Sequence, residues 1–206
     1  IDPLHALGFA VVLEIVAFLL LAMSSNLLAA SLAVAATGFY IFVYTMWLKR
    51  SSRQNIVIGG AAGAVPPLVG WAAVTGQVGI PAIILFAIIF VWTPPHFWAL
   101  SIKYRDDYAR ARVPMLPVVA TLAETKRQIS LYALALIPVS LLLLLTGTVG
   151  WIYGGAALVL GGVFALRSWR LRSDERPGAA MDVFKASISY LALIFPAVAL
   201  DQFFLG

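Results

Sequence analysis

The residues with the clearest chemical potential form one polar strip that follows a long apolar run. The strip combines two adjacent carboxylates with four cations: Asp106 and Asp107, with Lys103, Arg105, Arg110 and Arg112. Carboxylates bind Mg²⁺, which keeps several waters and bridges to substrate phosphates, while Lys and Arg neutralise the remaining charge of a diphosphate. Such a site would ionise a diphosphate ester by stabilising its leaving group. The same residues would also suit a solvated loop, where surface ion pairs contribute only about 0 to 1 kcal/mol.

A histidine lies in the apolar run before this strip. His96 directly follows Pro94 and Pro95, which remove two amide donors and therefore predict a bend in the helix. Lys103 stands seven residues after His96, close to the same face of a helix. Two interpretations of His96 carry equal weight at this point, a ligand and a packing residue.

These residues must be positioned by membrane-spanning helices. Of the 206 residues, 62% are apolar and 11% are charged, and several apolar runs reach the about 20 residues that cross a bilayer core. A soluble domain would need more charge to cover its surface. The chain has no cysteine, which excludes disulfides, thiolate metal sites and cysteine nucleophiles. The predicted fold class is an all-α, multi-pass transmembrane bundle.

Seven spans are predicted, separated by short polar or glycine-containing breaks. They cover about residues 5–23, 27–48, 56–74, 80–102, 129–145, 151–171 and 183–204. The fifth helix begins before its membrane part, because Thr121 and Glu124 have the spacing of a capping box. The last two spans need Arg167, Arg170 and Lys185 to extend toward an interface.

The cations predict the orientation of the chain. All 14 Lys and Arg residues fall at or beside the connections after the second, fourth and sixth spans, and the other three connections carry none. This is a positive-inside pattern, which places those connections and the N-terminus in the cytoplasm and the C-terminus outside. The positions of these cations explain the net charge of +5, so no nucleic-acid partner is needed to account for it. Cations at the membrane surface are also expected to contact membrane lipid.

Two further features of the spans, a row of glycines and a carboxylate, exceed what crossing a membrane requires. Gly59, Gly63 and Gly70 recur at helical spacing and favour close packing of another backbone over ligand contact. A carboxylate within a span is a candidate functional group, yet Glu14 is better interpreted as protonated or bonded to a neighbouring helix.

Aromatic side chains share one face of the second span. Tyr40, Tyr44 and Trp47 are three and four residues apart. A belt at the membrane surface and a wall around a ligand explain this pattern equally well.

Five segments together carry a family resemblance. They are YTMWLKR at 44–50, NIVIGGAAGAVPP at 55–67, GWAAVTG at 70–76, WTPPHFW at 92–98, and Asp107-Tyr108 followed by PMLP at 114–117. In this combination the chain resembles the protoheme IX farnesyltransferases, or haem O synthases, of the UbiA-type intramembrane prenyltransferase superfamily. The resemblance implies a bundle of nine spans, Mg²⁺, and transfer of a farnesyl group from farnesyl diphosphate to a vinyl group of haem B. It also implies the bacterial cytoplasmic (inner) membrane rather than the mitochondrial one, with haem A synthase or an oxidase-assembly protein as partner.

The resemblance also implies roles for individual residues. It places the second acidic motif of the superfamily on Asp106 and Asp107, as metal or diphosphate groups. The diphosphate-side cations would be Lys49, Arg50, Lys103 and Arg105. His96 would face the porphyrin or its reacting vinyl, Trp92 and Tyr44 would supply aromatic surface to an allylic cation, and Asn55 would contact substrate.

The chain departs from the family pattern in two places. The family has a glycine where Arg112 stands, and it has a first acidic motif, Asn-x-x-x-Asp-x-x-x-Asp, whereas Asp2 is the only acid before the first span. We therefore expect that motif and two further spans to precede Ile1, and that residues 1–206 form one prenyltransferase domain without them.

Two other functions fit parts of the sequence. A prenyltransferase acting on an aromatic quinone precursor would share the diphosphate residues but not the Pro-Pro-His-Phe-Trp run. A membrane haem-binding or transport protein would use His96 as an axial ligand and would need no pair of aspartates.

Overall fold

The computed structural model describes residues 2–205, and within that range every regular element is a helix. The helices form seven segments long and apolar enough to cross a membrane, as predicted. The long helices, with the elements that extend them, are α1 (Pro3–Ser24), α2 (Leu27–Gly38) with η1 (Phe39–Leu48) and α3 (Lys49–Ser51), α4 (Asn55–Ala64) with α5 (Pro66–Thr75), α6 (Ile80–Lys103), α9 (Leu122–Leu141) with η2 (Leu142–Thr146), α10 (Trp151–Arg170) and α11 (Ala179–Leu205). Two short helices, α7 (Arg105–Arg110) and α8 (Leu116–Val119), connect α6 to α9.

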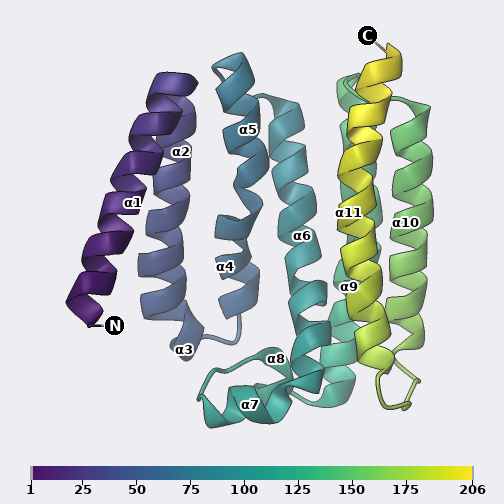
Figure 1. The fold of residues 1–206 in the computed structure, drawn as a ribbon. Helices are drawn as coiled ribbons and strands as arrows, with labels where there is room; N and C mark the ends of the chain where they lie inside the picture. Colours follow the sequence, from purple (N-terminus) through teal and green to yellow (C-terminus); the bar gives the residue numbers. More distant parts are fainter. Residues whose placement is uncertain (1, 206) are drawn as a thin grey trace.

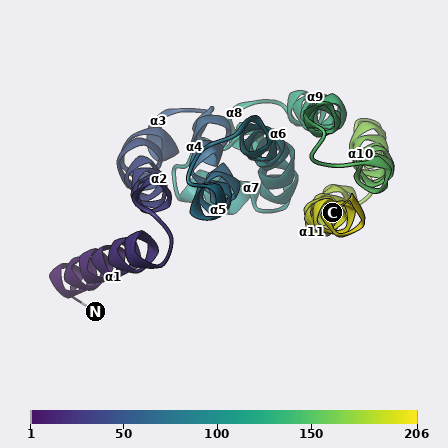
Figure 2. The ribbon, with the colours of Figure 1, turned by 90° about the horizontal axis from the view of Figure 1, so that it is seen from above.

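The helices form a compact group and a row that extends from it. Seen from above, α6, α9, α10 and α11 lie around one another, while α4/α5, α2 and α1 follow one after another away from this group (Figure 2). The largest cluster of buried apolar side chains lies mainly in the compact group, and it includes Ile88, Leu136, Phe164 and Tyr190. By contrast, α1 buries none of its residues. The site is therefore built where the compact group meets the row.

Two of the expected spans differ in detail from regular α-helices. The second changes at Phe39 into a π-helix of 10 residues, in which the hydroxyl of Thr45 donates to the carbonyl of Tyr40, five residues back. The third is interrupted at Val65, because Pro66 and Pro67 cannot donate to the carbonyls of the preceding turn. Neither change was predicted. Hydrophobic periodicity does not reveal a π-helix over so short a stretch, whereas the two prolines were a visible signal for the interruption.

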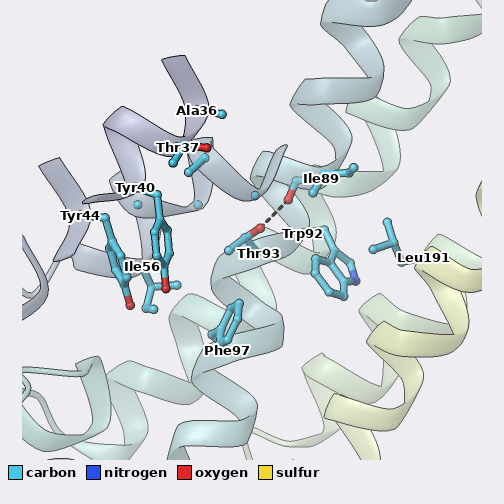
Figure 3. Close-up of a pocket in the computed structure, with 14 residues that line it drawn as sticks. Ala36, Thr37, Tyr40, Tyr44, Ile56, Ile89, Trp92, Thr93, Phe97 and Leu191 are labelled. Atoms are coloured by element: carbon cyan, nitrogen blue, oxygen red, sulfur yellow. Dashed lines mark hydrogen bonds between the residues drawn. The ribbon is translucent and has the colours of Figure 1, made fainter. Parts of the chain in front are cut away.

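Helix α6 continues through its two internal prolines. Pro94 and Pro95 both lie inside the helix and are buried. Nearby, the hydroxyl of Thr93 donates to the carbonyl of Ile89 at 2.7 Å (Figure 3). At the start of α9, the hydroxyl of Thr121 accepts from the amide of Glu124 at 3.2 Å, which is the half of the predicted capping box that fixes the helix start.

The connections rich in cations lie at one end of the molecule. Figure 1 shows α3, α7, α8 and the turn between α10 and α11 at the same end as the N-terminus, with the C-terminus at the other. A small buried cluster of Ile56, Val113 and Met115, with Tyr108 packed against it, joins the loop between α7 and α8 to the first turn of α4. The polar strip is thereby held against the membrane helices.

Candidate active site

An apolar cavity of about 610 Å³ opens between the row and the compact group. Figure 3 shows its walls: η1 and the end of α2 on one side, α6 on the other, and Leu191 of α11 at the far edge. The lining residues are Ala36, Thr37, Tyr40, Tyr44, Ile56, Gly59, Gly60, Ala62, Gly63, Ile89, Trp92, Thr93, Phe97 and Leu191. No charged side chain is among them, so the cavity suits a hydrocarbon chain rather than a free ion.

The aromatic residues of the second span were expected to form either a belt at the membrane surface or a wall around a ligand, and they do not all have the same surroundings. Tyr40 and Tyr44 lie side by side, with ring centroids 5.3 Å apart, and both line the cavity (Figure 3). Trp47 does not line it, and 65% of its surface is exposed. The π-helical turn explains the separation, because its longer repeat rotates Trp47 away from the face that Tyr40 and Tyr44 share. Tyr44 is therefore part of a cavity wall, as the ligand interpretation predicts.

Glycines of α4 bring that helix close to both walls. A Cβ atom at Gly59 would lie 2.2 Å from the ring of Tyr44, and one at Gly60 would lie 2.9 Å from the Cγ2 of Thr93. Close packing, the preferred interpretation, therefore holds for Gly59. Gly63 and Gly70 meet nothing within 4 Å, and Gly63 lines the cavity, so the glycine face also shapes a ligand space.

His96 lies within a stack of aromatic rings beside the cavity. Its imidazole is 4.1 Å from the ring of Trp92 on one side and 4.7 Å from that of Phe184 on the other, centroid to centroid. Its Nδ1 lies 2.7 Å from the hydroxyl of Ser187 in α11, and the indole nitrogen of Trp92 donates to the carbonyl of the same serine at 2.8 Å. Ser187 of α11 thus contacts both His96 and Trp92.

Asp106 and Asp107 occupy the first turn of α7, and both are exposed. Asp107 forms an ion pair with Arg110, one turn later in the same helix. Among the ion pairs of residues 2–205, none involves Asp106. Over the same range, no group of three or more His, Cys, Asp or Glu side chains is arranged to hold a metal ion. The acidic pair could therefore contribute part of a coordination shell, completed by other oxygens.

The predicted cations lie at the same end of the molecule but on different elements. Lys49 and Arg50 belong to α3, Lys103 ends α6 with its ammonium 5.4 Å from the ring centroid of Tyr104, and Arg105 begins α7. Figure 1 shows α3 and α7 at this end, below α4. The structure thus gathers these four cations at one end of the molecule, and within residues 2–205 none of them forms an ion pair.

Asn55 begins α4 and is 1% exposed. Its amide nitrogen donates to the carbonyl of Lys49 at 3.4 Å, a long bond, and its Oδ1 finds no hydrogen-bond partner in the described part of the chain. Asn55 therefore ties α3 to α4 directly beside Ile56, which lines the cavity. Glu14 lies elsewhere, in a groove between α1 and α2 near Ser31.

Comparison with known proteins decides the family. The model of the UbiA prenyltransferase family matches residues 1–191. The chain belongs to the UbiA prenyltransferase family. The family expectation drawn from the sequence motifs is confirmed, and the membrane bundle described above agrees with it.

Individual relatives in this family share about half of the residues. The chain is 53% identical over 208 residues to the protein named "Protoheme IX farnesyltransferase" of Gloeobacter violaceus, covering 98% of this chain and 67% of that protein. It is 53% identical over 207 residues to the protein of that name from Thermosynechococcus vestitus, covering 100% of this chain and 65% of that protein. It is 51% identical to another from Acidiphilium cryptum, covering 98% of this chain and 67% of the relative. The chain thus spans about two thirds of the length of these relatives, and no solved structure matches it.

Several residues at the site were not singled out from the sequence. Thr93, Ile89 and Leu191 line the cavity, and Ser187 contacts both His96 and Trp92. Thr93 could have been found, because it stands in the Trp-Thr-Pro-Pro-His run. Ser187 could not, since its role depends on α11 packing against α6, more than 90 residues away in the chain.

Proposed function

We propose that the protein to which this chain belongs transfers the farnesyl group of farnesyl diphosphate to a vinyl group of haem B, giving haem O. One observation carries this proposal: about 50% identity over nearly the whole chain to proteins named for that reaction. The apolar cavity, in a molecule whose acidic pair and cations gather at one end, also supports it, because the donor has a hydrocarbon chain attached to a polyanion.

Asp106 and Asp107, with the cations around them, are proposed to hold the diphosphate. Mg²⁺ is commonly bound by one or two carboxylates together with substrate phosphates, and the exposed Asp106 and Asp107 fit that donor set. When bound, the metal would stabilise the negative charge of the diphosphate leaving group. Lys49, Arg50, Lys103 and Arg105 would neutralise the remaining oxygens.

The farnesyl chain is proposed to lie in the cavity between η1 and α6. Tyr44 and Trp92 line this space and present aromatic faces, which attract a cation. Breaking the bond between the farnesyl carbon and the diphosphate oxygen leaves an allylic cation, to which the terminal vinyl carbon of haem donates its electron pair. Water then adds to the neighbouring vinyl carbon and loses a proton, so that the hydroxyethylfarnesyl group is complete.

The proposed cellular setting follows from the same residues. With the cation-rich connections in the cytoplasm, the diphosphate would bind at the cytoplasmic face of the bacterial inner membrane, and the farnesyl chain and haem would enter from the bilayer. Haem O would pass to a terminal oxidase or its assembly machinery, with haem A synthase as the partner that the family implies.

The decisive experiment compares two possible acceptors of the farnesyl group. Membranes containing the full-length protein are incubated with farnesyl diphosphate and Mg²⁺ and either haem B or 4-hydroxybenzoate, and products are identified by mass spectrometry. We expect haem O with the first acceptor and no prenylated product with the second. Prenylated 4-hydroxybenzoate would favour the quinone-precursor enzyme, and haem binding without any product would favour a transport protein.

A further inference from the structure

Ser187 makes three polar contacts that together define the state of its neighbour His96. Its hydroxyl lies 2.6 Å from the carbonyl oxygen of Phe184, one turn earlier in α11, and 2.7 Å from Nδ1 of His96 in α6. Its own carbonyl accepts the indole N–H of Trp92 at 2.8 Å. Ser187 is completely buried, so water does not compete for these bonds.

The hydroxyl can donate only one proton, and the geometry decides where that proton lies. A carbonyl oxygen only accepts, and two oxygens 2.6 Å apart with no proton between them would repel each other. The Ser187 proton therefore points to the carbonyl of Phe184. The oxygen must then accept from His96, which requires the proton of the neutral imidazole to lie on Nδ1 and leaves Nε2 with a free electron pair.

The surroundings of His96 leave only that nitrogen available. Trp92 and Phe184 cover the two faces of the ring, with interplanar angles of 22° and 29°. Stacking of His96 on a porphyrin is thereby excluded in this arrangement. Over residues 2–205, Nε2 makes no hydrogen bond and is absent from the buried polar atoms without a partner, so it reaches accessible space.

We propose that Ser187 is a positioning residue, which holds His96 as the Nδ1–H tautomer and so leaves Nε2 as the electron-pair donor to the iron of bound haem. Neutral imidazole is the commonest protein ligand for metals, and the second ring nitrogen of such a ligand is usually hydrogen-bonded in this way. The proposal relies on the proposed function only for the identity of haem. The tautomer itself follows from the contacts of the protein alone.

The tautomer can be measured without substrate. The full-length protein is labelled with ¹⁵N-histidine in lipid nanodiscs, and the His96 signals are assigned by comparison with His96→Gln. We expect Nδ1 protonated and Nε2 unprotonated in the wild-type protein and in Ser187→Thr, which keeps the hydroxyl. In Ser187→Ala, protonation should no longer be confined to Nδ1. The hydrogen bond of the Trp92 indole should persist, because it is donated to the backbone carbonyl of residue 187. Ser189→Ala, an exposed serine on the same helix, is the matched control and should resemble the wild type.

Binding of haem B, followed by its absorption spectrum, tests the ligand role. Loss of a hydrogen bond to a metal-bound histidine weakens metal binding by about 10-fold to 100-fold, and we expect a weakening of about 10-fold in Ser187→Ala but not in Ser189→Ala. A proton on Nε2 in the wild type, or a Ser187→Ala spectrum unchanged from it, would overturn the positioning role. Unchanged haem affinity in Ser187→Ala would overturn the ligand role. Failure of the full-length protein to form haem O would instead contradict the proposed function and leave the tautomer result intact.

Discussion

The carboxylate of Asp201, near the end of α11, accepts a hydrogen bond from the backbone amide of Tyr153 at 2.8 Å. It also accepts one from the amide of Gly150 at 2.7 Å, so a buried acid from the last helix caps the start of α10. Asp201 is 2% exposed. A negative charge at a helix N-terminus satisfies free amides and interacts favourably with the helix dipole. This contact ties the ends of the two helices together.

Removing this cap should destabilise the bundle. We expect Asp201→Ala to lower the free energy of unfolding by about 2 kcal/mol, because the buried amide of Tyr153 and the partly buried amide of Gly150 lose their acceptor. Asp201→Asn keeps an acceptor oxygen and should cost less. Thermal unfolding of the purified protein in detergent, followed by circular dichroism, measures both. Equal melting temperatures for the wild type and Asp201→Ala would contradict the capping role.

The cavity is predicted to control binding of the farnesyl chain. Gly63 and Gly70 both have open space where a side chain would begin, but only Gly63 lines the cavity. Gly63→Leu should therefore fill part of the cavity and raise the KM for farnesyl diphosphate at least about tenfold, a loss of about 1.4 kcal/mol of binding.

Gly70→Leu is the matched control, since both changes replace a helical glycine and remove its cost to helix stability, about 1 kcal/mol. It should leave the KM unchanged. Equal KM values for the two variants would show that the prenyl chain binds elsewhere.

The sequence predicted the general architecture well, for identifiable physical reasons. The seven spans were recognisable because each must be about 20 apolar residues long, and the breaks between them contain residues such as Asn26 and Gly79 that lie at helix starts. The start of α9 was likewise predicted from Thr121, whose side chain needs only local partners. The local chemistry of caps and the length of spans do not depend on how the helices pack.

Features that depend on packing between helices were not predictable. The burial of Asp201 requires α10 to lie beside α11, and the contact of Ser187 with His96 requires α11 to lie beside α6. The separation of Tyr44 from Trp47 depends on a π-helical segment that the pattern of apolar residues does not reveal. The roles of Asp106 and Asp107 remain predictions, because their chemistry involves a substrate.

The acidic pair gives the most direct prediction for the reaction. Asp106→Asn should lower kcat by about 100-fold or more, as expected when a group that stabilises developing negative charge is removed. Haem binding should persist, because Asp106 lies on α7 and makes none of the contacts that hold the ring stack around His96. Farnesyl transfer is measured with the full-length protein at saturating haem B.

Asp182→Asn is a suitable control for the charge change. Asp182 is also an exposed acid in the first turn of a helix, at the same end of the molecule. Its substitution should leave kcat unchanged. Full activity of Asp106→Asn would remove this residue from the proposed metal site.

Trp92 is predicted to stabilise the allylic cation. Replacement of its ring in Trp92→Leu should lower kcat about tenfold, since a cation–π interaction at a desolvated site is worth about 1 to 2 kcal/mol. Trp92→Phe loses the indole bond to Ser187 but keeps an aromatic face, and it should retain more activity. If the two variants were equally active at saturating haem, the aromatic face would not contribute.

Arg112 adopts a backbone conformation that favours glycine. Its φ of 54° is the only positive value among the non-glycine residues of 2–205, and it falls at the position where the family resemblance implies a glycine. A left-handed residue with a side chain costs about 1 to 2 kcal/mol, whereas the greater freedom of an unfolded glycine costs about 0.5 to 1 kcal/mol. Arg112→Gly should therefore raise the free energy of unfolding by about 0.5 to 1 kcal/mol. Arg112→Ala is the control, because it removes the same charge and keeps the backbone strain. A higher melting temperature for Arg112→Gly than for Arg112→Ala would show that the gain comes from the backbone. Equal melting temperatures for the two variants would contradict this explanation.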